Sequence, residues 1–447
     1  MFKTLRDAFS IPEIRKKLLY TLLMLLVFRL GGAVVVPFLD TSSVSTWMES
    51  NATGGNFLEY LDIITGGALS QATVFSLSIT PYINASIIMQ LLTYALPPLE
   101  RMRDEGEEGQ KKLNKITAAV SLALSAFMSF AYYLTLKNQM DAVQTSAEIF
   151  GTASKAVDVF IAFVIILSFI AGTSIVVWMG NQINDKGIGN GISMLLFAGI
   201  LARFPVMAGT LGELIVENPQ RYFFESLGVL VLFIIMIGFI VFMNAAERRI
   251  PIQYAKRVVG RKQYGGQSTH IPVKVCMSGV MPIIFAMSFM SLPSTISLFK
   301  PVYQEPSGFW QNFYNGFINF FNTRTWTYAL VYFILIIAFN YFYVAMQYNP
   351  IEIANNLRQN NGGIPGIRPG KPTSDYIQRV LSKITLVGAF FLGIIAIFPI
   401  ALTWFDSNLG SLAMGGTTIL IVVSVALETV RTLESEMMMR HHKGFLE

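Results

Sequence analysis

The chain has 447 residues, of which 53% are hydrophobic and only 13% are charged, and its formal net charge is +6. A soluble domain carries about a quarter of charged residues, so this composition excludes a soluble enzyme and predicts a polytopic membrane protein. The single cysteine, Cys276, excludes an intrachain disulfide and a multi-cysteine metal site.

Ten apolar runs are candidates for membrane-spanning helices, because about 20 apolar residues cross the hydrocarbon core of a bilayer. They cover residues 18–39, 74–96, 116–136, 156–179, 188–207, 227–245, 271–298, 326–348, 384–405 and 412–426. The first run ends in no small-residue cleavage site, so we interpret it as a retained helix and not as a signal peptide. The pattern predicts an all-α polytopic membrane protein with ten transmembrane helices.

Lysine and arginine are distributed unevenly over the segments that join these runs. If successive runs alternate in direction, 26 of the 33 basic residues lie on one side, six lie on the other, and Arg29 lies inside the first run. Loops rich in Lys and Arg stay in the cytoplasm. We therefore expect both termini to be cytoplasmic.

Ten helices divide into two sets of five, and an odd number per set gives the two halves opposite orientations, as in many transport proteins. We expect a cytoplasmic segment at 1–17, an N-terminal half at 18–208, a C-terminal half at 221–430 and a cytoplasmic tail at 431–447.

Four of the runs would make poor lipid-facing helices. The second contains Pro81, the seventh contains Pro282 and Pro293, and the fifth and tenth are rich in glycine. Unpaired polar groups are costly in hydrocarbon, so such helices belong at helix contacts or along a water-filled cavity. Packing through small residues explains one helix of this kind, whereas several together favour a passage with polar walls.

Few charges lie within the runs. Arg29 and Arg203 are the clear cases, and no relay of Asp or Glu crosses the membrane midplane, which argues against an ion pump. We expect Arg29 to extend toward the interface or to pair with a neighbouring carbonyl group.

The segment at residues 56–72, between the first two runs, has helical periodicity. Leu61 and Ile64 belong to its apolar pattern, which Gly66 and Gly67 interrupt. The segment is too short to span a membrane. It is either an interfacial amphipathic helix or a re-entrant segment that fills a cavity inside the protein.

Two basic loops, at 247–274 and 348–383, are longer than a simple connection requires. The first mixes basic residues with β-formers such as Ile252 and Val258, which predicts a protruding hairpin. Basic patches with exposed polar backbone suit the docking of ribosomal RNA or of an acidic protein.

Nucleotide and metal motifs are missing from the sequence. The stretch before Lys371 has Pro365 where a phosphate loop requires glycine, and Pro372 replaces the required Ser or Thr. The GIGNG stretch at Gly187 follows no predicted strand, so it is not a dinucleotide site. We expect no enzymatic activity, no cofactor and no metal.

Several long stretches resemble the SecY family of protein-conducting channels. They are GGALSQATVFSLSITPYINASIIMQLL from Gly66, GIGNGISMLLFAGI from Gly187, RRIPIQYAKR from Arg248, GQSTHIPVKV from Gly266, GVMPIIFA from Gly279 and GGIPGIRPGKPT from Gly362. The likeness runs in order from the first span to the tenth. It implies an hourglass of two inverted five-helix halves with a ring of aliphatic side chains at the waist.

Matching these motifs residue by residue implies the positions of the ring. They are Ile79, Ile83, Ile192, Leu196, Met281, Ile284 and, on the tenth span, Leu420 or Ile421. The spacing agrees with this, because Ile79 and Ile83 are four residues apart and share one helix face.

The resemblance also implies a plug at about 57–70 and a lateral gate between the second and third spans on one side and the seventh and eighth on the other. The plug residues are Phe57, Leu61, Ile64, Gly66 and Gly67. The gate candidates are Asn84, Gln90 and Leu292. Signal sequences and membrane helices leave through such a gate.

The implied partners are the SecA ATPase and the ribosome, which dock on the basic loops. The docking candidates are Arg248, Arg249, Lys256, Arg257, Arg261, Lys262, Arg368 and Lys371. SecE-like and SecG-like small membrane subunits, signal peptides, nascent chains and membrane lipids complete the expected set. The expected location is the cytoplasmic membrane.

The expected function is that of the pore-forming subunit of a protein translocase, driven by an ATPase or by translation. A secondary transporter of an uncharged solute is the alternative, and it predicts a compact midplane site with a few polar groups. A membrane scaffold is a third possibility, and it predicts no sealed pore.

Overall fold

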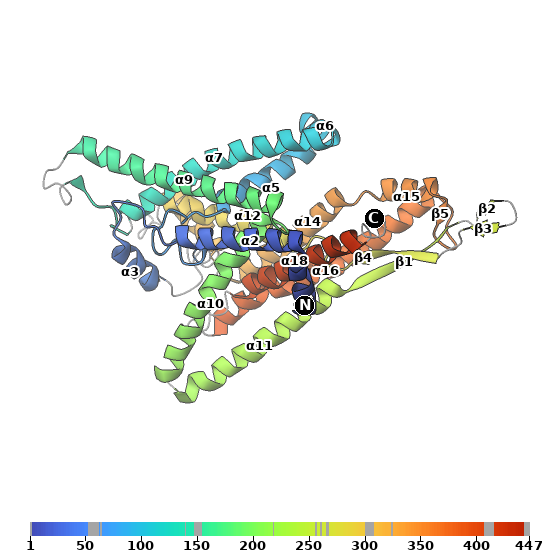
Figure 1. Cartoon of the computed structure of the whole chain (residues 1–447). Coiled ribbons are helices and arrows are strands. Elements are labelled where there is room, and N and C mark those ends of the chain that lie inside the picture. Colours follow the sequence, from blue (N-terminus) through green and yellow to red (C-terminus); the bar gives the residue numbers. More distant parts are fainter. Residues whose placement is uncertain are drawn as a thin grey trace.

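The computed structural model describes residues 2–51, 62, 65–138, 140–146, 154–217, 219–254, 257–259, 262–264, 268–299, 308–322, 325–405 and 415–441. Most of this part of the chain is helical, with one strand-rich projection (Figure 1). The all-α prediction is therefore confirmed for the membrane region.

Helices occupy all ten positions predicted to span the membrane. They are α2 (Pro12–Gly31), α5 (Thr80–Ala95), α7 (Glu107–Asn138), α9 (Lys155–Lys186), α10 (Gly191–Glu217), α11 (Pro219–Ala245), α12 (Met281–Phe299), α14 (Trp326–Gln347), α16 (Lys371–Phe405) and α18 (Gly415–His441). The shorter helices are α1 (Phe2–Ser10), α3 (Thr41–Asn51), α6 (Pro97–Asp104), α13 (Phe309–Phe320) and α15 (Pro350–Gln359).

Length and composition separate these helices into strong and weak membrane spans. Four described helical stretches are long and apolar enough to cross a membrane: Glu107–Asn138, Lys155–Lys186, Trp326–Gln359 and Lys371–Phe398. Shorter apolar stretches lie in α10, α11 and α12. Helix α5 has 16 residues, and at 1.5 Å per residue it falls short of the ~30 Å hydrocarbon core.

The second span begins at Thr80 and not at residue 74. Residues 66–79 form turns, in which the Ser76 hydroxyl donates to the carbonyl oxygens of Thr73 and Ala68 at 2.6 and 2.9 Å. Non-helical backbone at this depth is tolerated because it is buried in protein. Pro81 lies in the first turn of α5, where its missing N–H is harmless, so it begins this helix and does not break it.

Two other predicted spans are wrong at one end. The first run predicts a helix to residue 39, but α2 ends at Gly31 and the chain then turns, with Val35 in a β-bridge to Thr73. The seventh run predicts a helix from residue 271, but Ile271 lies in a strand and α12 starts at Met281. Apolar strand residues lengthen this run, and hydropathy does not separate a short strand from a helix.

The helices pack as two halves that face each other across one interface. The N-terminal half has a buried cluster around Tyr132 and Phe169, and the C-terminal half has one around Tyr332 and Ile395. At one edge of the interface α10 packs against α18, and at the other α5 and α7 pack against α12. Contacts between corresponding helices are those expected of two inverted five-helix halves.

The two long basic loops form one projection beyond the helices (Figure 1). Its strands are β1 (Glu247–Tyr254), β2 (Arg257–Val259), β3 (Lys262–Tyr264), β4 (Ser268–Lys274) and β5 (Gly362–Gly363). Strands β1 and β4 pair antiparallel, with Ile250 opposite Ile271, and β5 pairs with the other edge of β1. The predicted hairpin is confirmed, and the second basic loop is joined to it.

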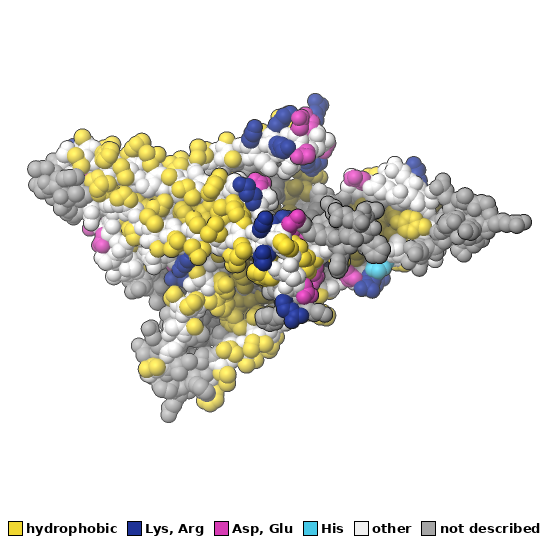
Figure 2. All heavy atoms as spheres, viewed as in Figure 1, with side chains coloured by type: hydrophobic (Ala, Val, Ile, Leu, Met, Phe, Trp, Pro, Cys, Tyr) yellow, Lys and Arg dark blue, Asp and Glu magenta, His cyan; other side chains and the backbone are white. Residues whose placement is uncertain are grey.

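Side-chain types are segregated on the surface (Figure 2). Hydrophobic side chains cover much of the helical body in this view, and Lys and Arg gather around α6, the N-terminal region and the hairpin side. Exposed apolar residues such as Leu230, Ile234 and Phe242 of α11 are 50% or more accessible. An apolar belt with charges gathered at one end is the surface of a multi-pass membrane protein.

Candidate functional site

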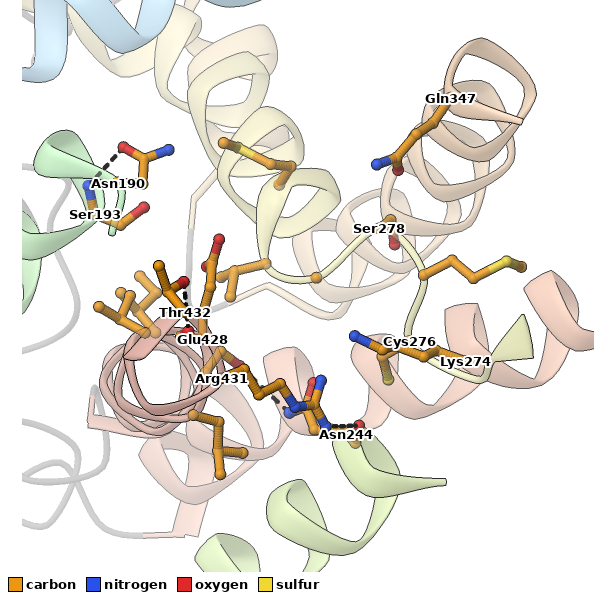
Figure 3. A pocket seen from close by; sticks show the side chains of 18 of the residues that line it. Asn190, Ser193, Asn244, Lys274, Cys276, Ser278, Gln347, Glu428, Arg431 and Thr432 are labelled. Atoms are coloured by element: carbon orange, nitrogen blue, oxygen red, sulfur yellow. Dashed lines mark hydrogen bonds between the residues drawn. The ribbon is translucent and has the colours of Figure 1, made fainter. Parts of the chain in front are cut away.

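A cavity of about 760 Å³ lies between the two halves on the side of the hairpin (Figure 3). Its wall comes from α10, α12, α14 and α18, together with the end of β4 and the turn that follows it. Polar side chains surround this space, among them Asn190 just before α10, Ser193 of α10, Gln347 of α14 and Glu428 of α18. The cavity is therefore a polar-walled space built by both halves.

Four of the predicted ring residues form an apolar wall of this cavity: Leu196, Met281, Ile284 and Ile421. Leu196 also belongs to a buried cluster with Ile79, and Ile83 and Ile192 pack against that cluster. The ring candidates thus fall into two groups that share Leu196, one from α5 and α10 and the other from α10, α12 and α18.

The tenth span offers two neighbouring ring candidates that face different surroundings. Leu420 is 1% exposed and packs in the core of the C-terminal half. Ile421 lines the cavity and packs with Ile200 and Val425. Successive helical residues point about 100° apart, so Ile421 is the member of this pair that joins the apolar wall.

Charged groups lie around the wider part of the cavity (Figure 3). Burial, and next the Arg431 guanidinium, lower the pKa of Lys274. Arg431 Nη2 donates to the carbonyl oxygen of Asn244 at 2.9 Å, which fixes its head. No group of three or more His, Cys, Asp or Glu side chains is placed to hold a metal within the described ranges.

The predicted plug is described only at its end, since Phe57, Leu61 and Ile64 lie outside the described residues. Gly66 and Gly67 form a buried turn with φ of +72° and +87°, a backbone region that glycine tolerates. Arg29 Nη1 donates to the Gly66 carbonyl oxygen at 2.9 Å. The predicted pairing of Arg29 with a neighbouring carbonyl is confirmed.

The partner of the second intramembrane arginine is missed by sequence reasoning. Arg203 Nη2 lies 2.6 Å from Asp62 Oδ2, and the Asp62 side chain is 2% exposed. The available signal is an aspartate in a mostly apolar segment, together with an arginine within a span. The sequence does not give the distance between Asp62 and Arg203, so the ion pair is recognised only once the fold is known.

The gate candidates lie on α5 and α12, two helices from opposite halves that pack against each other. Asn84 Oδ1 and Gln90 Oε1 of α5 are buried and accept no hydrogen bond within the described part of the chain. Leu292 of α12 is 51% exposed. Nearby, the rings of Tyr94 on α5 and Phe342 on α14 meet edge to face with centroids 5.6 Å apart. The packing of α5 and α7 against α12 is less extensive than the packing of helices within each half.

The first docking loop presents basic residues on an exposed hairpin. Arg248 and Arg249 are exposed on β1, and Arg249 Nε lies 2.7 Å from Glu247 Oε1. The other candidates divide by position: Arg257 lies on β2 and Lys262 on β3, whereas Lys256 and Arg261 lie outside the described residues.

The second docking loop holds Arg368 on a defined turn. Gly366 and Gly370 flank it with φ of +80° and +101°. The Thr373 hydroxyl donates to the Arg368 carbonyl oxygen at 2.8 Å, which ties the turn to the start of α16. The Arg368 and Lys371 side chains are exposed, so the structure fixes the backbone here and leaves the charged groups free to bind.

Two apolar-coated helical halves around a polar cavity with an apolar wall define a multi-pass membrane protein with the architecture of a channel. The family model described as SecY matches residues 73–430. The protein translocase subunit SecY of Streptomyces lividans is 38% identical over 450 residues, which cover 100% of both chains. The chain therefore belongs to the SecY family and is a protein-conducting channel subunit of protein translocase.

Solved structures share this fold. A SecY structure, whose plug domain is described as stabilising the closed state of the translocation channel and maintaining a membrane seal, gives a TM-score of 0.59 at 18% identity. Sec61 in the canine ribosome-channel complex gives a TM-score of 0.54 at 16% identity. Each alignment covers 96% of both chains.

Proposed function

We propose that unfolded secretory polypeptides cross the membrane through the cavity between the halves, and that the apolar wall closes this path at rest. The observation that carries the proposal is the meeting of aliphatic side chains from both halves, such as Ile200 with Ile421, beside a polar cavity. An apolar constriction excludes ions because water leaves it. Aliphatic contacts are weak and non-directional, so they part around a chain and close after it.

A photoreactive amino acid at Ile284 tests this path, because Ile284 lines the cavity. It should cross-link to a secretory polypeptide stalled during export. The matched control is Leu230 of α11, which is 56% exposed on the outside of the bundle. Adducts at position 230 but not at 284 would place the path elsewhere, and a transporter of a small solute gives no polypeptide adduct at either position.

The segment at about 57–70 is proposed to be a plug. A lateral gate is proposed to lie between α5 and α7 on one side and α12 and α14 on the other. The buried oxygens of Asn84 and Gln90 support the gate, because unpaired polar atoms weaken a closed contact and bind water or a peptide once it opens. Membrane helices leave the cavity through this boundary into the lipid.

The hairpin and the Arg368 turn are proposed to dock the SecA motor and the ribosome. They support this role because they form one basic, exposed projection, and a ribosome-bound Sec61 shares the fold. The charge distribution supports a cytoplasmic location of this end and of both termini. Small SecE-like and SecG-like subunits are proposed to complete the channel in the cytoplasmic membrane.

A further inference from the structure

A buried ion pair joins the end of the plug segment to a helix of the N-terminal half. Asp62 Oδ2 lies 2.6 Å from Arg203 Nη2 of α10, and Asp62 Oδ1 accepts a hydrogen bond from the Ser70 amide at 2.7 Å. The Gly67 amide donates to the Asp62 carbonyl oxygen at 2.8 Å. Asp62 therefore holds both its own turn and a helix about 140 residues away in sequence.

The two glycines of this turn lie between two guanidinium groups. Arg29 Nη1 donates to the Gly66 carbonyl oxygen at 2.9 Å. A side chain at Gly67 would place its Cβ 3.2 Å from Arg203 Nη1, and one at Gly66 would place its Cβ 2.7 Å from the Gly199 carbonyl oxygen. The turn is thus pressed against α10 and held from both sides by cations.

A charged pair in this position has a different effect from an apolar contact. A buried ion pair gains little net stability over an apolar replacement, but the loss of one partner is costly because it leaves an unpaired charge. A hydrogen-bonded pair also fixes one position, whereas aliphatic contacts tolerate sliding. The Arg203 side chain remains 28% exposed, so the pair is enclosed at Asp62 and accessible at its other end.

We propose that Asp62 and Arg203, with Arg29 on the Gly66 carbonyl, form an ionic latch that positions the plug segment against α10 and sets how readily the closed channel opens. The proposal rests on the proposed role of the segment as a plug. As the halves part, water reaches the pair, the local dielectric constant rises and the attraction weakens. The latch therefore resists the first displacement and releases once opening has begun.

The position of the turn is measured directly by cysteine labelling. Thr65 is 2% exposed beside Asp62, so Thr65→Cys in a Cys276→Ser background reports displacement by its reaction with a water-soluble maleimide. The full chain and its small partner subunits are placed in vesicles, and both the labelling rate and the resting ion conductance are measured per channel. The variants are Asp62→Asn, Arg203→Gln and the two combined. The matched control is Asp40→Asn, which removes another acid whose partners, Ser42 and Ser43, are local.

Each single substitution should raise the labelling rate about tenfold. An unpaired charge that is fully buried would raise the rate further, but Arg203 is partly exposed, which lowers the cost of unpairing it. The combined variant should label no faster than either single variant, because it leaves no unpaired charge. Arg203→Lys keeps the charge and should label much more slowly than Arg203→Gln. Asp40→Asn should match the parent.

The outcomes separate the latch from the plug. Labelling at the parental rate in Asp62→Asn, or fully additive effects in the combined variant, overturns the latch. Equal labelling of Arg203→Lys and Arg203→Gln also overturns it, because charge would then not be what holds the turn. Faster labelling with unchanged conductance supports the latch and rejects the sealing role of the plug segment.

Discussion

Arg368 is proposed to dock a partner, and the fixed backbone of its turn supports this role. Its turn is fixed by Gly366, Gly370 and the Thr373 hydroxyl, and Pro369 keeps Arg368 itself out of the helical region. A charge on a preorganised turn loses less entropy when a partner binds. We expect Arg368→Glu to abolish motor-driven export while the protein still accumulates in the membrane.

Arg368→Lys distinguishes docking from a simple topological charge. A guanidinium makes paired hydrogen bonds that an ammonium does not reproduce, so the lysine variant should lose roughly tenfold in export rate, equivalent to about 1.4 kcal/mol of binding. Export is measured in vesicles matched for channel content, with Arg249→Lys on the hairpin as a comparison. Full export by the Glu variant would show that Arg368 does not dock the motor.

At the level of single residues, helix periodicity predicts which side chains share a helix face. The four-residue spacing of Ile79 and Ile83 places them on one face, and both lie in or against the same cluster. Periodicity does not fix the rotation of a helix about its own axis, so it left Leu420 and Ile421 unresolved. The Asp62–Arg203 pair depends on a distance across the fold, which no local pattern encodes.

At the scale of elements, the described end of the segment before α5 belongs to the core of the N-terminal half. Ala68 and Leu69 are 2% and 1% exposed, and Leu69 belongs to the cluster of the N-terminal half. The Tyr132 hydroxyl donates to the Leu69 carbonyl oxygen at 3.0 Å. The plug proposed at 57–70 therefore includes residues that anchor the fold.

Replacement of residues 57–64 with glycine and serine, with Asp62 retained to keep its pair with Arg203, should leave the amount of inserted channel unchanged and allow export of proteins with defective signal sequences. Leu69→Ala should instead destabilise the protein by about 2–5 kcal/mol, the usual cost of a cavity in a packed core. Immunoblots of membranes and an export assay with a weak signal sequence measure both effects. Loss of the inserted protein in the 57–64 variant would mean that this segment is structural.

The boundaries of elements were the weakest sequence predictions, for identifiable reasons. Val273 is buried and Ile271 partly buried in the strand-rich projection, so their hydropathy resembles that of the adjoining span. The residues at 74–79, which form turns before α5, are likewise mostly buried. Hydropathy reports burial and not backbone conformation, and only tertiary contacts separate the two.

At the scale of the whole molecule, the two-half architecture followed from the sequence because membrane topology is encoded in simple quantities. Span number and the uneven distribution of Lys and Arg require no knowledge of packing. The meeting of α10 with α18 and of α5 and α7 with α12 does require it, since the halves lack obvious sequence repetition. The cavity and its apolar wall, as far as the described residues show them, lie at that interface.

The central claim is that the aliphatic residues between the halves seal the channel at rest, and resting ion conductance tests it most directly. Ile83, Ile192 and Ile284 are replaced together with serine, and three isoleucines exposed on the outside, Ile175, Ile234 and Ile334, serve as the matched control. The three residues are partly buried, so each contributes a part of the ~1.5–3 kcal/mol that full burial of an isoleucine is worth. Conductance per channel in planar bilayers should rise at least about tenfold in the first variant and stay at the parental level in the control. Parental conductance in the first variant would contradict the account.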